Sequence, residues 1–169
     1  MPLIVETGEI IPNADSYVSL EDARAYAESY GIVLPEDDTE AERALRNGAA
    51  YVGLQEPQMC GSRVSPAQAL AYPRKGVTLF GYPVPSDSIP FQIIQAQIAA
   101  AAEYGKGTDV RASSDGRMTS LERVEGAVTV EYFNNGVSGS TTTITAAMDA
   151  LGPLLCGSTN GFEFRVYRG

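Results

Sequence analysis

The stretch PFQIIQAQIAAAAEY (residues 90–104) decides the fold. Pro90 stands where the first residue of a helix is expected, because proline has no N–H to leave unpaired there. Ile93, Ile94 and Ile98 recur at helical spacing, and the run that follows them is small and apolar on nearly every side. Because a helix that is apolar all round is buried, the sequence predicts a central helix over 90–104.

Three further helices of the bundle are predicted from capping residues and apolar periodicity. Ser19 begins a capping box that opens a helix over 19–30. Thr39 opens a second helix over 39–54, which carries one apolar stripe. A last helical pattern covers 144–155.

A short helix is predicted over 66–71, in the stretch SPAQALAYPRK. Ser65 can cap a free N–H and Gln68 can reach back to the chain, while the proline after Tyr72 disfavours helical geometry at that tyrosine. We expect this helix to pack Ala69 and Leu70 against the bundle and to turn the chain before the central helix. The residues with a structural role in this motif are Ser65, Pro66, Ala69, Leu70, Tyr72, Pro73 and Arg74.

Two extensions from the bundle are expected. Residues 105–143 are polar and rich in glycine, and the alternation in LERVEGAVTVEYF (121–133) predicts a β-hairpin inserted in a flexible loop. The C-terminal arm, 157–169, ends in the alternating stretch FEFRVYRG. The hairpin either reaches a neighbouring subunit or folds back on its own bundle, and the arm either joins another subunit or pairs with the hairpin at 121–133.

The predicted fold is therefore mainly α: a small helical bundle with an inserted β-hairpin and an extended C-terminal arm, all in one domain over 1–169. The candidate contact residues of the arm are Phe162, Phe164, Arg165, Val166, Tyr167 and Arg168.

Composition argues against most enzyme classes. The chain has no histidine, which excludes the usual serine and cysteine triads and the commonest zinc ligand. No phosphate-binding loop, dinucleotide fingerprint or metal spacing occurs, so we expect no catalytic residue, cofactor or metal. Cys60 and Cys156 are expected to be buried free thiols, with a disulfide as the alternative. No signal peptide or membrane span is expected, and synthesis in the cytoplasm follows.

Charge is distributed unevenly along the chain. Residues 1–60 hold 12 acidic and 3 basic side chains, whereas residues 61–169 hold 9 of each. Nucleic-acid binding therefore requires a local patch, because cations that neutralise phosphates supply most of its affinity. Aromatic and basic residues coincide only at Tyr72 with Arg74 and Lys75, and at Tyr167 with its flanking arginines. Each group fits either a protein contact or base stacking.

Several motifs in order resemble one family. They are LIVETG (3–8), NADSYVSLEDARAYAESYG (13–31), SPAQALAYPRKGV (65–77), VPSDSIPFQIIQAQIAAAAEY (84–104) and VEGAVTVEYF (124–133). Together they resemble tailed-phage proteins described as DnaT-like single-stranded-DNA-binding proteins. The layout is also similar to head-to-tail connector, or head-completion adaptor, proteins. Tyr72 stands where relatives commonly have tryptophan.

The resemblance implies two possible functions. The main expectation is a structural virion protein at the neck: a homo-oligomeric ring, of twelve subunits, that contacts the portal protein and a tail-side neck or tail-terminator protein. Packaged DNA would pass through its acidic channel without specific binding. The alternative is a phage single-stranded-DNA-binding protein of a DnaT-like replication type, which needs an aromatic, cationic surface.

Overall fold

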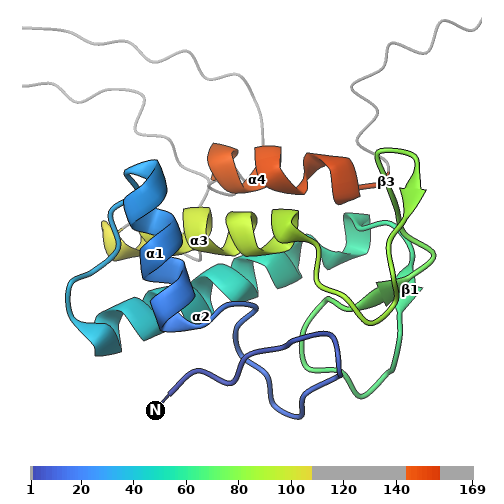
Figure 1. Ribbon diagram of the computed structural model, residues 1–169, viewed down its shortest axis with the longest axis horizontal. Coiled ribbons are helices and arrows are strands. Elements are labelled where there is room, and N and C mark those ends of the chain that lie inside the picture. The colour runs from blue at the N-terminus through green and yellow to red at the C-terminus, as the bar shows by residue number, and fades with distance from the viewer. Residues whose placement is uncertain (1, 108–143, 157–169) are drawn as a thin grey trace, which may run out of the picture. The chain divides into compact units, whose positions relative to one another are not determined.

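The structure of the chain is a computed structural model that describes residues 2–107 and 144–156 (Figure 1). These residues belong to one compact unit. The predictions for the hairpin at 121–133 and for the arm at 157–169 fall outside the described residues.

The first two helices begin and end at local signals. α1 (Leu20–Tyr30) starts after Ser19, whose side chain accepts the Asp22 N–H at 3.1 Å, and ends at Gly31 with φ of 67°. α2 (Asp38–Leu54) starts after Asp37, whose carboxylate accepts the Glu40 N–H at 2.9 Å. Asp37 therefore caps α2 instead of the predicted Thr39.

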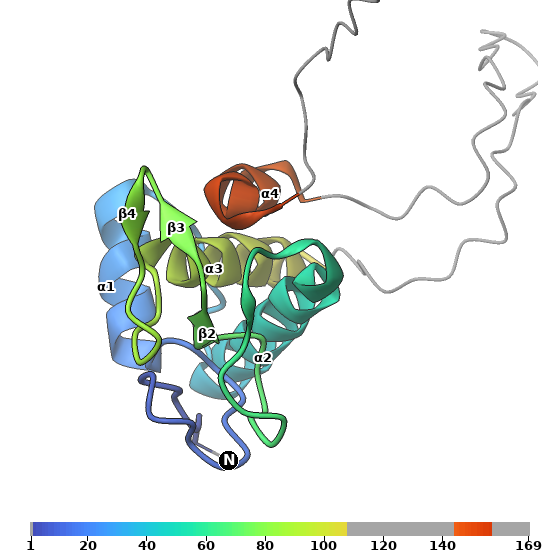
Figure 2. The same ribbon diagram turned by 90° about the vertical axis from the view of Figure 1, so that its right-hand side faces the viewer.

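α3 (Phe91–Gly105) is the central helix, and it packs against α2 on one side and α4 on another (Figures 1 and 2). Ile93, Ile98 and four alanines are buried, namely Ala96, Ala100, Ala101 and Ala102. The Gln97 side chain is also fully buried, where it donates to Ser16 Oγ at 2.7 Å and to the Leu45 carbonyl at 3.0 Å. The apolar pattern of the helix is thus explained by its neighbours on several sides.

α4 (Thr145–Leu151) is shorter than the predicted helix over 144–155. A 3-10 turn, η2 (Gly152–Leu154), continues the chain, because Pro153 cannot donate the next helical hydrogen bond. The Ile144 N–H donates to the buried Tyr51 hydroxyl of α2 at 3.0 Å, which holds the start of α4 on the bundle.

Two small antiparallel sheets make the described fold mixed instead of mainly α. After η1 (Glu56–Gln58), β1 (Ser62–Arg63) pairs with β2 (Arg74–Lys75), and β3 (Thr78–Leu79) pairs with β4 (Tyr82–Pro83). The helical core agrees with the predicted bundle. The sheets were not predicted, because strands of two residues are too short to show alternation.

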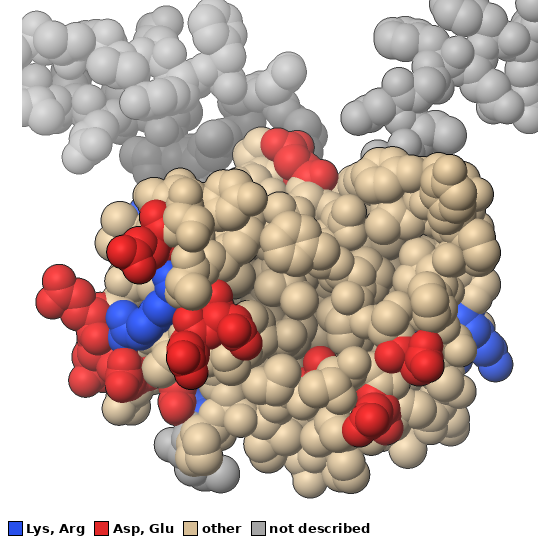
Figure 3. All heavy atoms as spheres, in the orientation of Figure 1, with Lys and Arg blue, Asp and Glu red and all other residues tan. Residues whose placement is uncertain are grey.

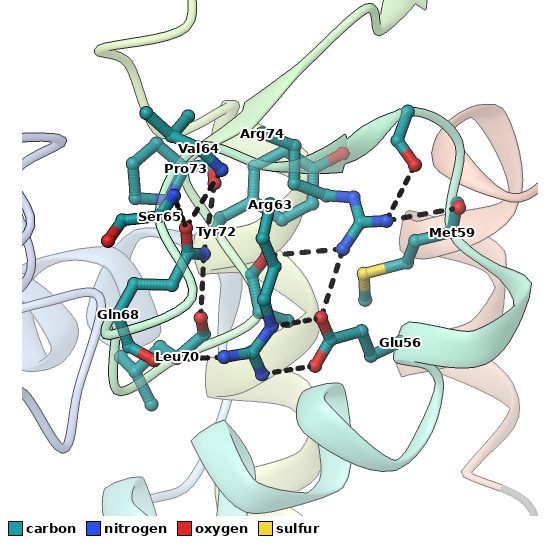
Figure 4. Close-up of polar contacts among 12 residues, drawn as sticks. Glu56, Met59, Arg63, Val64, Ser65, Gln68, Leu70, Tyr72, Pro73 and Arg74 are labelled. Carbon is teal, nitrogen blue, oxygen red and sulfur yellow. Dashed lines mark hydrogen bonds and ion pairs between the residues drawn. The ribbon is translucent and has the colours of Figure 1, made fainter.

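The predicted helix over 66–71 does not form: the residues between β1 and β2 make turns. The Gln68 side chain instead bridges backbone groups from both ends of this loop (Figure 4). Its Oε1 accepts the Val64 and Ser65 N–H groups at 3.0 and 3.1 Å, and its Nε2 donates to the Leu70 and Pro73 carbonyls at 2.9 and 3.0 Å. A loop wrapped around one buried amide replaces the helix.

Cys60 and Cys156 form a disulfide, so the expectation of free thiols is wrong. Their Cα atoms lie 4.8 Å apart. Backbone hydrogen bonds bring the two segments together, from Cys60 to the Leu154 carbonyl at 2.9 Å and from Cys156 to the Gln58 carbonyl at 2.7 Å. Contacts between residues 96 positions apart create this pairing, and no local pattern indicates them.

No helix in the described ranges is long and apolar enough to cross a membrane.

Candidate functional site

Glu56, Arg63 and Arg74 hold the loop after η1 in place (Figure 4). Arg63 donates to both carboxylate oxygens of Glu56, from Nε to Oε1 and from Nη2 to Oε2, each at 2.6 Å. Arg74 Nη1 lies 3.2 Å from the same Oε1. The hydrogen bond from Arg63 is the main reason why the pKa of Glu56 lies below its ordinary value. The carboxylate therefore stays ionised between two guanidinium groups.

Arg74 is an internal residue, with 6% of its surface exposed. Its Nε donates to the Cys60 carbonyl and its Nη2 to the Gly61 carbonyl, both at 2.8 Å. These bonds commit the guanidinium N–H groups to carbonyls of the protein's own backbone. Arg74 consequently stabilises the loop and is not available to bind a phosphate group.

Tyr72 is also internal, with 0% of its surface exposed. Its backbone N–H donates to the Tyr17 hydroxyl at 3.2 Å, and a cis peptide bond joins it to Pro73. Burial raises the pKa of Tyr72 to about 12. Base stacking requires an accessible ring, so the predicted pairing of Tyr72 with Arg74 makes no nucleic-acid surface.

The remaining residues of the predicted motif lie on the outside of this loop. Ser65 Oγ accepts the Ala67 N–H at 3.2 Å, which caps a turn instead of a helix. Pro66 and Ala69 are exposed and Leu70 is half-buried, so the expected burial of Ala69 is wrong. The second predicted group, from Phe162 to Arg168, falls outside the described residues.

The β3–β4 hairpin carries the two most exposed aromatic residues in the part of the chain that the structure describes. Phe80 is 74% exposed and Tyr82 is 76% exposed. Phe80 and Gly81 form the two-residue turn, with φ of 52° and 87°, which is the pattern of a type I′ turn. A bulky residue rarely adopts positive φ, and such positions gather at functional sites. The turn thus keeps the Phe80 ring exposed to solvent, although the positive φ of this residue is energetically unfavourable.

The base of the hairpin is anchored and carries a free cation. Val77 is buried, and its carbonyl accepts the Val84 N–H at 2.9 Å. Lys75, two residues earlier, is exposed and forms no ion pair within the described residues. No acidic residue occurs over 74–84. Among the described residues, Figure 3 shows no acidic side chain at the upper right of this face, where Figure 1 places β3, whereas most of the acidic side chains on this face lie at the left, toward α1.

A second group of aromatic residues lies between α1 and α3. The Tyr26 and Tyr30 rings stack with centroids 4.4 Å apart, and Phe91 meets Tyr26 edge-on at 5.8 Å. Tyr30 is 64% exposed and Phe91 51% exposed. Asp22 lies one turn before Tyr26 on the same face of α1, so a carboxylate adjoins this group and makes it a poor surface for phosphates.

Phe80 and Tyr82 are the candidate functional residues that the sequence analysis missed. The signal was the tetrapeptide LFGY (79–82), in which a glycine in the second turn position is flanked by apolar residues. The prolines near this tetrapeptide indicated an irregular segment, so the hairpin was not predicted. Among residues 2–107 and 144–156, no group of three or more histidine, cysteine, aspartate or glutamate side chains is placed to hold a metal ion.

Comparisons with known proteins identify a family. No curated protein and no solved structure matches the chain. The family model described as "Putative DnaT-like ssDNA binding protein" matches residues 1–169. This match contradicts the main expectation of a structural head-to-tail adaptor and favours the alternative of a single-stranded-DNA-binding protein. Since the match covers the whole sequence, the chain belongs to the DnaT-like ssDNA binding protein family.

Proposed function

We propose that the protein binds single-stranded DNA by stacking bases on Phe80 and Tyr82, with Lys75 contacting a neighbouring phosphate. The family match supports the choice of ligand. The exposure of both rings on the β3–β4 hairpin is the observation that carries the choice of surface.

Stacking suits the chemistry of this hairpin. Every base has an aromatic face, so exposed rings bind single strands with little sequence preference. In duplex DNA those faces are covered by neighbouring bases, so the hairpin prefers single strands. Each stacked base is worth about 1–3 kcal/mol when the ring is replaced by alanine.

Charge makes only a small contribution to this mode of binding. The chain carries a net charge of −9, and Lys75 is the one exposed cation of the 74–84 segment. For single strands, the logarithm of the binding constant falls with the logarithm of salt concentration by about 0.7 for each phosphate neutralised. One lysine contact therefore predicts a shallow salt dependence, unlike that of proteins with basic grooves.

Fluorescence anisotropy of a labelled oligothymidine tests the proposal. Phe80→Ala and Tyr82→Ala should each weaken binding by about 5- to 150-fold, which corresponds to the stacking energy above. Lys75→Ala should weaken binding less and should reduce the salt slope by about 0.7. Tyr30→Ala, which removes another exposed ring far along the chain, serves as the matched control.

The outcome can contradict the proposal in two ways. Wild-type binding that survives the double substitution of Phe80 and Tyr82 would place the DNA elsewhere on the chain. A loss of binding in Tyr30→Ala equal to that in Phe80→Ala would show that the hairpin is not the specific surface.

A further inference from the structure

We propose that a groove between α1 and α3 binds a basic, amphipathic segment of a protein partner. The groove has a volume of about 400 Å³. Val18 and Ile98 form part of its floor, Ile94 lies beside them, and Tyr26 and Phe91 form its walls. This volume falls within the range that accommodates a few side chains or a small ligand.

The walls of the α1–α3 groove are rigid aromatic residues. Tyr26 is held from one side by stacking on Tyr30 and from another by the edge of Phe91. Gln95 Nε2 donates to the Tyr26 hydroxyl at 3.1 Å, which fixes the ring further. Pre-organised aromatic residues lose little entropy when a partner packs on them, and such residues dominate binding energy at protein interfaces.

Exposure of these rings indicates that a partner covers them. Phe91, which lines the groove, and Tyr30, which stacks on the groove residue Tyr26, each leave more than half of their surface in water. Contiguous apolar surface rimmed by polar residues is typical of interaction sites. The groove belongs to a different part of the face from the proposed DNA-binding hairpin, because α1 and β3 lie at opposite ends in Figure 1.

The charge around the groove selects the chemistry of the partner. Asp22 is the only charged residue among the described residues that line the groove. The only cation of α1, Arg24, is already paired with Asp38 at 2.7 Å. Figure 3 shows acidic side chains gathered over this end of the face. A segment with apolar anchors and flanking lysines or arginines complements this surface, whereas DNA and a second acidic copy of the chain are repelled.

A pair of synthetic peptides tests the inference on the full-length protein. Both peptides are amphipathic helices with the same leucines, and they differ only in carrying lysines or glutamates at the polar positions. The lysine peptide should bind saturably, and methyl signals of Ile94 and Ile98 should shift while those of Ile144, a buried residue outside the groove, stay in place. The glutamate peptide should not bind.

Variants distinguish binding in the groove from general attraction between a basic peptide and an acidic protein. Phe91→Ala keeps every charge and should weaken the lysine peptide about tenfold or more, as expected for an aromatic anchor. Asp22→Asn, which removes the charge at the rim, should weaken it several-fold, and salt should reduce this difference. Lys75→Ala is the control and should bind the peptide as the wild type does.

Three results would overturn the inference. Equal binding of the lysine peptide to Phe91→Ala would show attraction to acidic surface alone. Displacement of the peptide by oligothymidine, with isoleucine shifts caused by the DNA, would make the groove a nucleic-acid site. Dimers of the free protein that Phe91→Ala dissociates, seen by sedimentation, would assign the groove to a second copy of the chain. None of these results depends on whether Phe80 and Tyr82 bind DNA.

Discussion

Replacing Gly48 with alanine should destabilise the fold, because α2 and α3 meet at this glycine. A Cβ atom on residue 48 would overlap the Gln97 carbonyl oxygen and would lie 3.1 Å from the Ala101 nitrogen. Both are main-chain atoms inside α3, so neither can rotate away as a flexible side chain would. The helices must separate or shift to make room.

The expected magnitude follows from two opposing effects. Overpacking of a tight contact costs about 1–3 kcal/mol. Alanine is a better helix former than glycine, which offsets about 0.5–1 kcal/mol of that cost. We therefore expect Gly48→Ala to lower the free energy of unfolding by about 1–2 kcal/mol. In a chain of this size, the melting temperature falls by about 2–4 °C for each kcal/mol lost.

Gly53→Ala provides a matched control in the same helix. A Cβ on Gly53 meets nothing within 4 Å, so only the gain in helix propensity remains. This variant should be more stable than the wild type by about 0.5–1 kcal/mol. Because the chain has no tryptophan, urea unfolding is best followed by far-UV circular dichroism. If both substitutions raise the midpoint, the close packing of α2 on α3 at Gly48 is refuted.

Two further predictions concern the loop between η1 and β3. Cys60→Ser should lower the free energy of unfolding by about 4–5 kcal/mol under non-reducing conditions, because the disulfide to Cys156 closes a loop of 96 residues; equal denaturation curves with and without reductant for the wild type would contradict this. Glu56→Gln should cost about 1–3 kcal/mol at neutral pH, because the ionised carboxylate accepts hydrogen bonds from Arg63 and Arg74. Since the folded-state pKa of Glu56 lies below its unfolded value, this stabilisation is present at neutral pH and is lost as the pH falls below about 4.3 and through the folded value. The wild type should therefore lose stability on acidification more steeply than Glu56→Gln, and parallel curves would show that the cluster does not hold the loop.

Local sequence signals determined the three long helices. Ser19 and Gly31 bound α1 because a capping hydroxyl and a residue with positive φ act on their nearest neighbours in the chain. The isoleucines and alanines of α3 likewise indicated a helix buried on several sides, and α3 is the central helix. Caps and periodicity depend on residues three or four positions apart, so the sequence alone contains them.

Tertiary structure decided the loop and the candidate site. The sequence predicts a helix over 66–71, but the structure has a loop there, in which the buried Gln68 amide bonds four backbone groups. Burial also assigns opposite roles to similar residues: Tyr72 lies inside and Tyr82 lies in water, although both precede a proline. The Cys60–Cys156 disulfide likewise requires segments far apart in the chain to meet. The exposure of a side chain and the pairing of distant residues depend on which segments pack against one another. Patterns within a few residues of sequence do not determine that packing.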